Sequence, residues 1–215
     1  ADYSIKAAIS GGVNTVTGAI TTTGGQNKIG IFASGSDTGL GTVTVGGKGN
    51  IGVYGKDSKL TVSGITVADS TLTNTEDIPV GVVLNGGSYI GSGNVSVGNN
   101  GIGLYATGIQ NNIQHNGGTL GVENSSLGFY GEGTGTNSLT VNTTGITLGD
   151  NNSIGVYAKN INSSVTGDMY VGTNTSIGIV SEGTGNVTYS GDLTIADKGT
   201  GEKDTGSVGI YKKEG

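Results

Sequence analysis

One short pattern recurs eight times along this chain of 215 residues: an apolar residue, a glycine, an apolar residue and usually an aromatic. Successive copies are 22 to 31 residues apart, and their glycines are Gly30, Gly52, Gly81, Gly103, Gly128, Gly155, Gly178 and Gly209. A unit of this length cannot bury an apolar face alone, so copies at such a period stack on their neighbours. The repeat therefore predicts a single stacked domain over residues 1–215.

Each period also contains further short stretches in which apolar residues alternate with threonine, such as residues 60–62 (Leu-Thr-Val) and 65–67 (Ile-Thr-Val). Alternation of this kind is typical of strands that bury one face. About three strands per period, in constant order, predict an all-β chain: a right-handed parallel β-helix, or β-solenoid, of about eight coils with roughly 25 residues each. A sandwich of hairpins does not explain the constant order. At ~4.8 Å between stacked strands, the rod is expected to be roughly 40 Å long.

Hydrophobicity assigns a face to each position of the repeat. The residues directly before and after the glycine are apolar in all eight copies. Strict alternation therefore predicts two core columns, with the glycine on the outer wall. Asparagine stands four residues before the glycine in four copies: Asn99, Asn124, Asn151 and Asn174. Asparagine favours left-handed turns and its amides stack between coils, so this position predicts either a shaped turn or an asparagine ladder.

The aromatic residue two positions after the glycine is the candidate binding position. It is occupied by Phe32, Tyr54, Tyr105, Tyr130, Tyr157 and Tyr211. Strict alternation places these rings on the outer face, as a platform for a glycan or a protein partner. A bend just past the glycine would instead half-bury them as a stacking ladder. The small residues that follow favour this second arrangement: Ala33, Gly55, Ala106, Gly131 and Ala158.

Three long intervals between strands predict outward loops. They cover residues 69–77, 107–118 and 197–206, and the second contains the only histidine of the chain, His115. Insertions in a solenoid often contact partners, although plain solvated loops have the same composition. Both interpretations stay open for these three segments.

The amino-acid composition limits which kinds of binding site the chain can form. The chain has no cysteine and one histidine, so neither a disulfide, a zinc site nor a cofactor is expected. Its net charge is −6, and its ten cationic residues are all lysines. Such an acidic chain is poorly suited to bind nucleic acid or an anionic membrane surface. No apolar run approaches the ~20 residues of a membrane span, and the start at Ala1 suggests a segment of a longer protein.

The motifs in this sequence give little support for a catalytic function. Residues 47–52 match G-x-G-x-x-G, but no helix is expected after them, and Gly52 already belongs to the repeat. Asp150, Asp168 and Asp192 are candidates to meet in space, as are Asp37 and Asp57. Paired carboxylates are able to cleave a sugar, but acids in turns are usually only solvated. The sequence therefore predicts a protein that is not an enzyme.

The repeat itself carries a resemblance. Residues 153–160 read Ser-Ile-Gly-Val-Tyr-Ala-Lys-Asn, and residues 50–56 and 207–212 are close variants. This style of repeat resembles the passenger domains of type V autotransporters, in particular the large fusobacterial outer-membrane adhesins. The resemblance implies a surface-exposed β-helix that is anchored in the outer membrane by a C-terminal β-barrel outside this segment. No binding residue follows from it, because the matching residues are structural positions.

The resemblance implies an extracellular adhesin or stalk that mediates or supports attachment to host cells or other bacteria. Its partner would be a host or bacterial surface protein or a glycan. Two alternatives from other classes stay open: a glycan-active β-helix lyase or hydrolase, and an ice-binding solenoid. An enzyme needs a cleft with clustered acids and a cation, and ice binding needs a flat threonine array on coils of constant length.

Overall fold

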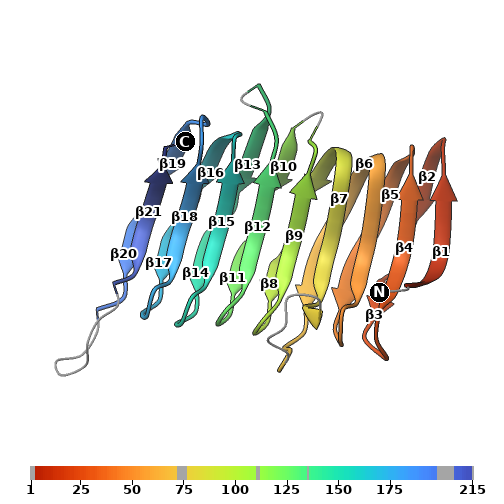
Figure 1. Cartoon of the computed structure of the whole chain (residues 1–215), viewed down its shortest axis with the longest axis horizontal. Coiled ribbons are helices and arrows are strands. Elements are labelled where there is room, and N and C mark those ends of the chain that lie inside the picture. The colour runs from red at the N-terminus through yellow and green to blue at the C-terminus, as the bar shows by residue number, and fades with distance from the viewer. Residues whose placement is uncertain (1–2, 72–76, 110–111, 135, 198–205, 215) are drawn as a thin grey trace.

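The computed structural model of the chain is a parallel β-solenoid of about eight turns with ~24 residues per turn. The structure describes residues 3–71, 77–109, 112–134, 136–197 and 206–214. Figure 1 shows the turns following one another along the long axis, from β1 at one end to β21 at the other. The solenoid expected from the repeat is confirmed, and its right-handed sense stays a prediction.

Each turn contributes strands to three parallel stacks, which we call the first, second and third sheets in chain order. The first sheet contains every copy of the repeat. Its strands are β1 (Ser4–Ser10), β4 (Lys28–Ser34), the first part of β6 (Ile51–Val67), the first part of β7 (Val80–Gly91), β9 (Ile102–Thr107), β12 (Leu127–Glu132), β15 (Ile154–Lys159), β18 (Ile177–Glu182) and β21 (Val208–Lys213). The register places Phe129 opposite Val156 and Tyr130 opposite Tyr157, so one copy of the repeat is one turn.

The second and third sheets complete each turn. The second sheet comprises β2 (Val13–Val16), the first part of β5 (Asp37–Val45), the middle of β6, the end of β7, β10 (Ile113–Asn116), β13 (Ser138–Asn142), β16 (Asn162–Thr166) and β19 (Val187–Ser190). The third comprises β3 (Ile20–Thr22), the ends of β5 and β6, β8 (Val95–Val97), β11 (Thr119–Val122), β14 (Gly145–Leu148), β17 (Met169–Val171) and β20 (Leu193–Ile195). In β14, Ile146 and Leu148 are buried and Thr147 is exposed, as alternation predicts.

The core consists of columns that pass through successive turns. The apolar residue after the repeat glycine is buried in seven turns, and only Ile210, in the last described strand, is 39% exposed. The buried members of this column pack against inward residues of the other two sheets, such as Leu139 and Ile146. Each fully buried side chain of this size contributes ~1.5–3 kcal/mol. Burial of these columns therefore holds neighbouring turns together.

The glycine column lies inside the solenoid, so the prediction that it forms the outer wall is wrong. A Cβ at Gly128 would lie 2.5 Å from the carbonyl oxygen of Gly155 in the next turn and 3.1 Å from the Leu120 side chain. The same approach of a glycine carbonyl in the next turn recurs at Gly30, Gly52, Gly81, Gly103, Gly155 and Gly178. Glycine and the apolar residue after it therefore both face inward, and strict alternation breaks at this point.

Because alternation breaks at the glycine, only one of the two predicted core columns is in the core. The residue before the glycine lies on the outer side of the first sheet. Ile29 and Ile51 are nevertheless buried there. The other members of this column are half-buried: Val80, Ile102, Leu127, Ile154, Ile177 and Val208.

The small residue after the aromatic lies in the core and does not mark the bend that it suggested. Strand β9 continues through Ala106, which is fully buried. A Cβ at Gly55 would lie 2.8 Å from Leu60, and one at Gly131 would lie 3.2 Å from Leu139. The small residues therefore leave room for the leucine that begins the second sheet.

The left-handed turn residue lies three positions before the glycine, one position later than the asparagine pattern indicated. Its φ is between 51° and 65° at Asn27, Gly49, Asn100, Ser125, Asn152, Thr175 and Gly206. Among the four predicted asparagines, Asn151 and Asn174 also have positive φ. The Asn174 amide donates to Asn151 Oδ1 at 3.1 Å, whereas the Asn99 amide donates to Asp69 at 3.1 Å. The predicted asparagine ladder thus exists between the turns of Asn151 and Asn174.

Buried serines connect the turns at the corner that precedes the first sheet. Ser176 Oγ accepts a hydrogen bond from the Ser153 N–H at 3.3 Å and donates to the Gly149 carbonyl at 2.9 Å. Ser126 Oγ accepts from the Gly101 N–H at 3.1 Å in the same way. Buried backbone groups need such partners wherever the sheet ladder is interrupted. These serines therefore take the place of backbone partners at the corner.

The predicted outward loop that contains His115 is wrong for its described part. His115 lies in β10 and is fully buried, and Ile109 before it is buried as well. Tyr89 Oη lies 3.4 Å from His115 Nδ1, and His115 Nε2 lies 3.0 Å from the Gly93 carbonyl oxygen. Burial lowers the pKa of His115 and raises the pKa of Tyr89. Most of the other two predicted loops, residues 72–76 and 198–205, lies outside the described residues.

Candidate functional site

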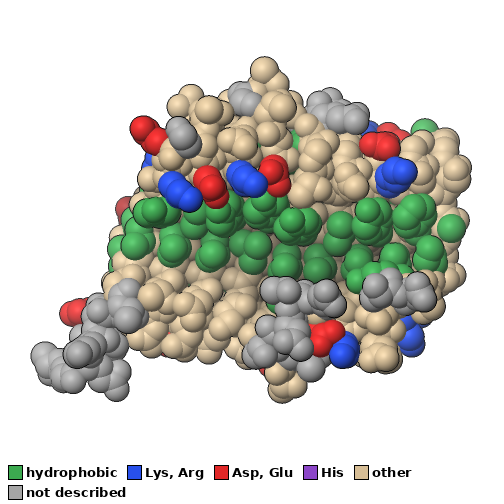
Figure 2. All heavy atoms as spheres, viewed as in Figure 1, with side chains coloured by type: hydrophobic (Ala, Val, Ile, Leu, Met, Phe, Trp, Pro, Cys, Tyr) green, Lys and Arg blue, Asp and Glu red, His purple; other side chains and the backbone are tan. Residues whose placement is uncertain are grey.

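Two adjoining apolar columns run along the outer side of the first sheet (Figure 2). One is the column before the repeat glycine, which is half-buried except at the buried Ile29 and Ile51. The other lies two positions after the glycine and consists of Phe32, Tyr54, Val83, Tyr105, Tyr130, Tyr157, Val180 and Tyr211. We call the two columns together the apolar stripe. A continuous apolar row along a whole face is unusual on a monomeric soluble protein and typically marks an interaction surface.

Neighbouring rings stack within the apolar stripe. The ring centroids of Phe32 and Tyr54 are 5.6 Å apart with an interplanar angle of 12°. Tyr105 and Tyr130 are 4.7 Å apart at 10°, and Tyr130 and Tyr157 are 5.4 Å apart at 39°. The structure thus combines the two predicted arrangements, because the rings lie on the outer face and also form a stacking ladder. Each stacked face is covered by the next ring, so a partner would mainly meet ring edges and hydroxyl groups.

Two valines interrupt the aromatic column. Val83 separates Tyr54 from Tyr105, and Val180 separates Tyr157 from Tyr211. The six predicted residues therefore form a pair, a triplet and an isolated ring. Tyr105 is 36% exposed and Tyr211 is 45% exposed, while the other four are half-buried.

A row of alternating charges flanks the tyrosine triplet (Figure 2). Its members Glu132, Lys159, Glu182 and Lys213 lie opposite one another in successive turns. Lys159 Nζ lies 2.9 Å from Glu132 Oε1, and Lys213 Nζ lies 3.6 Å from Glu182 Oε1. Exposed pairs of this kind contribute only ~0–1 kcal/mol each. These pairs therefore add little to the stability of the fold.

Tyrosine hydroxyls connect the stripe to this charge row. Tyr130 Oη donates to Glu132 Oε2 at 2.9 Å, and Tyr157 Oη donates to Glu182. Hydrogen bonds from Lys159 and then Tyr130 lower the pKa of Glu132, and the bond from Tyr157 lowers the pKa of Glu182. The bond to Glu182, together with burial, raises the pKa of Tyr157 to about 12. Both carboxyl groups therefore hold the tyrosine hydroxyls as ionised acceptors.

A further exposed tyrosine, Tyr170, lies on the outer side of the third sheet and is not among the predicted binding residues. It is 46% exposed. Its column contains one residue per turn: Thr21, Thr44, Thr66, Ser96, Gly121, Thr147, Tyr170 and Thr194. The sequence carries a signal for it, because Tyr170 occupies the position that threonine usually takes between two apolar residues.

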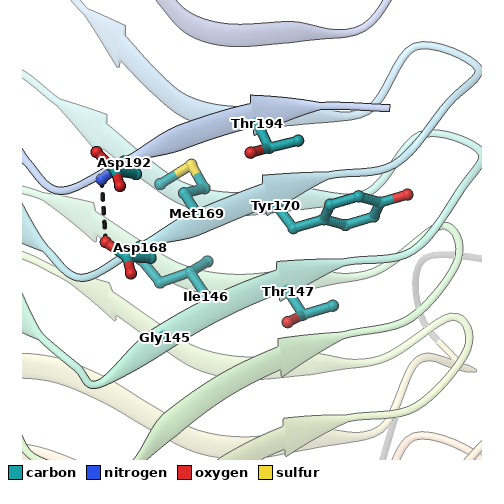
Figure 3. A pocket seen from close by; sticks show the side chains of 8 residues that line it. All are labelled: Gly145, Ile146, Thr147, Asp168, Met169, Tyr170, Asp192 and Thr194. Carbon is teal, nitrogen blue, oxygen red and sulfur yellow. Dashed lines mark hydrogen bonds between the residues drawn. The ribbon is translucent and has the colours of Figure 1, made fainter. Parts of the chain in front are cut away.

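Two shallow hollows meet at the Tyr170 side chain. The first has a volume of about 430 Å³ and is lined by Gly145, Ile146, Thr147, Asp168, Met169, Tyr170, Asp192 and Thr194 (Figure 3). The second has a volume of about 420 Å³ and is lined by Gly121, Val122, Glu123, Thr147, Leu148, Gly149, Asp150 and Tyr170. In Figure 3 the Tyr170 ring lies between Thr147 and Thr194, and both aspartates come directly before their strands, on the side away from the ring.

The structure brings together two of the three predicted acids. The Asp192 N–H donates to Asp168 Oδ1 at 3.0 Å, so these residues are neighbours in adjacent turns. Asp150 lines the second hollow, where the Thr173 N–H donates to its Oδ1 at 2.7 Å and lowers its pKa. Asp37 forms an ion pair with Lys59 at 2.8 Å.

Within the residues that the structure describes, no group of three or more histidines, cysteines, aspartates or glutamates is placed to hold a metal ion. Within the same residues, no helix has the length and apolar character needed to cross a membrane.

The fold places the chain in the class of parallel β-solenoids. Comparisons of the chain with protein-family models, with curated proteins and with solved structures found no match.

Proposed function

We propose that the chain is a segment of a bacterial cell-surface adhesin, a binding stalk that attaches to host cells or to other bacteria. The apolar stripe carries this proposal. It extends along one whole face of a regular rod, and the hydroxyls of Tyr130 and Tyr157 are held in place beside it. A face of this length suits repeated weak contacts with a partner surface, whose total strength grows with the number of contacts.

Two further properties support the proposal. The solenoid is stiff, because every turn is hydrogen-bonded to the turns on both sides and buries side chains against them. The repeat resembles that of autotransporter passenger domains, in which such a rod extends from the outer membrane. In this setting the protein is extracellular and its partner is a surface protein or a glycan.

The experiment is an attachment assay with the purified chain on fluorescent beads. We expect coated beads to adhere to epithelial cells or to a bacterial partner in excess of beads coated with albumin. A matched double variant, Tyr105→Thr with Tyr157→Thr, removes two rings from the stripe but keeps residues that favour strands. Attachment by this variant is expected to fall at least severalfold, with an unchanged circular dichroism spectrum.

Two results would contradict the proposal. Wild-type beads that adhere no better than albumin beads would show that this segment does not attach. Attachment that is equal for the wild type and the double variant would show that the apolar stripe is not the attachment surface.

A further inference from the structure

We infer that Tyr170 and the hollow in Figure 3 form a binding site for an uncharged sugar ring of a cell-surface glycan. This inference goes beyond the proposed attachment function, because it assigns a second site with a ligand class of its own. It differs from that proposal in its location, since Tyr170 lies in the third sheet and the apolar stripe lies on the first.

The first argument is that the Tyr170 ring is available for stacking. In the apolar stripe the rings of Tyr105 and Tyr130 stack on each other, and the Tyr157 ring packs against Tyr130 at a tilt. The neighbours of Tyr170 in its own column are the small side chains of Thr147 and Thr194. An aromatic face that is exposed beside a hollow suits the C–H groups of a pyranose ring, which an aromatic π-system attracts.

The second argument is the shape of the hollow. The hollow is shallow and has a volume of about 430 Å³, so a ligand there lies against the surface of the third sheet. Gly145 helps to create it, because the nearest atom to a Cβ built there is the Asp168 carbonyl oxygen at 3.9 Å. Two residues of strand, about 6.6 Å, separate the positions of Asp168 and Tyr170. In Figure 3 the Tyr170 ring extends away from both aspartates, so a pyranose that stacks on the ring lies nearer to Thr147 and Thr194 than to the carboxylates.

The third argument is charge and hydrogen-bonding capacity. Both charged residues that line the hollow are aspartates, and Thr147 and Thr194 add hydroxyl groups. Ionised carboxylates only accept hydrogen bonds, and sugar hydroxyls donate them. Asp168 uses Oδ1 for the Asp192 N–H, and its Oδ2 is a second hydrogen-bond acceptor. The same carboxylates repel acidic sugars, so the site selects uncharged ones.

The test is saturation-transfer-difference NMR of the purified chain with four probes: the methyl glycosides of galactose, glucose, N-acetylglucosamine and N-acetylneuraminic acid. We expect at least one of the three neutral sugars to bind at millimolar concentration, and N-acetylneuraminate to bind about tenfold more weakly or not at all. Tyr170→Ala is expected to weaken binding about tenfold, as the loss of a stacked ring does.

Matched substitutions locate the site. Gly145→Thr fills the first hollow and is expected to weaken sugar binding about as much as Tyr170→Ala. Gly121→Thr is the control, because it fills the second hollow and restores the threonine of its column, and its affinity is expected to stay within twofold of the wild type. Circular dichroism confirms that each variant is folded.

Failure of this inference is distinguishable from failure of the proposed function. The sugar site is refuted if no neutral sugar binds, if Tyr170→Ala binds as the wild type does, or if N-acetylneuraminate binds as tightly as the neutral sugars. Beads that attach to cells through the apolar stripe in spite of such a result leave the adhesin proposal standing. Sugar binding at Tyr170 without bead attachment supports the site and refutes the attachment function of this segment.

Discussion

Replacing one repeat glycine by alanine is the most informative perturbation of the fold. At Gly128 the new Cβ would lie 2.5 Å from the Gly155 carbonyl oxygen, and this backbone atom belongs to a ladder that cannot move alone. Overpacking of a core typically costs 1–3 kcal/mol, and a contact with backbone belongs to the upper part of that range. We therefore expect Gly128→Ala to lower the free energy of unfolding by about 2–3 kcal/mol, or the melting temperature by roughly 5–10 °C.

Gly121→Ala is the matched control for this experiment. Gly121 lies in the preceding strand β11, and a Cβ there would have no neighbour within 4 Å. Neither glycine has a positive φ, so alanine brings no backbone strain at either position. Alanine also restricts the unfolded chain, so we expect Gly121→Ala to be neutral or to stabilise by up to ~1 kcal/mol.

Thermal and urea unfolding, followed by far-ultraviolet circular dichroism, measure both variants. A glycine on the outer wall would tolerate alanine at Gly128 as well as at Gly121. Equal melting temperatures for the two variants would therefore refute the inward-facing glycine column.

Three further predictions concern individual side chains. The folded state holds His115 neutral, so the unfolded chain gains the proton first as the pH falls below the ordinary histidine pKa of 6.5. The free energy of unfolding in urea is therefore expected to fall by up to ~1.4 kcal/mol per pH unit between pH 6.5 and 5, before most carboxylates titrate. His115→Leu should remove this slope. Ser176→Ala leaves the Gly149 carbonyl without its hydroxyl donor and is expected to cost ~1–3 kcal/mol in the same unfolding assay, whereas the exposed Ser96→Ala should change little. Glu182→Gln removes the ionised acceptor of the Tyr157 hydroxyl, so the pKa of Tyr157 should fall from about 12 toward 10.0 in a spectrophotometric or NMR titration. An unchanged pKa would show that this hydrogen bond does not raise the pKa of Tyr157.

The repeat predicted the solenoid because its spacing reports directly on the stacking of turns. Residues at the same place in two copies, such as Tyr130 and Tyr157, are partners in the parallel register. The third sheet was equally predictable, because apolar-Thr-apolar segments obey strict alternation. Ile146, Thr147 and Leu148 alternate between buried and exposed as this rule requires.

The faces around the repeat glycine could not be predicted by the same rule. Strict alternation assumes an unbroken strand, but Gly128 and Phe129 both face inward. Only the absence of a Cβ allows this local break, and glycine in a strand does not reveal whether it breaks the alternation or simply continues it. The outward position of the residue before the glycine was missed for this reason.

The prediction of an outward loop at residues 107–118 was wrong because polar residues lie inside the turns there. A stretch with glycine, asparagine and histidine has the composition of a solvated loop, yet His115 is buried beside Tyr89 and the Gly93 carbonyl. Those partners come from the previous turn, so no local pattern identifies them. Tyr170, in contrast, was detectable, because it replaces threonine in an otherwise regular column.

The central claim is that the aromatic column follows one outer face, turn by turn, from Phe32 to Tyr211. The chain has no native cysteine, so Phe32→Cys with Tyr211→Cys accepts two spin labels without competition. Seven steps between adjacent strands separate these positions, which at ~4.8 Å per step predicts a distance of roughly 34 Å. Pulsed electron–electron double resonance should show one narrow distribution near this distance, allowing for the label linkers. A broad distribution, or a maximum more than about 10 Å away, would contradict the parallel stacking of one repeat per turn.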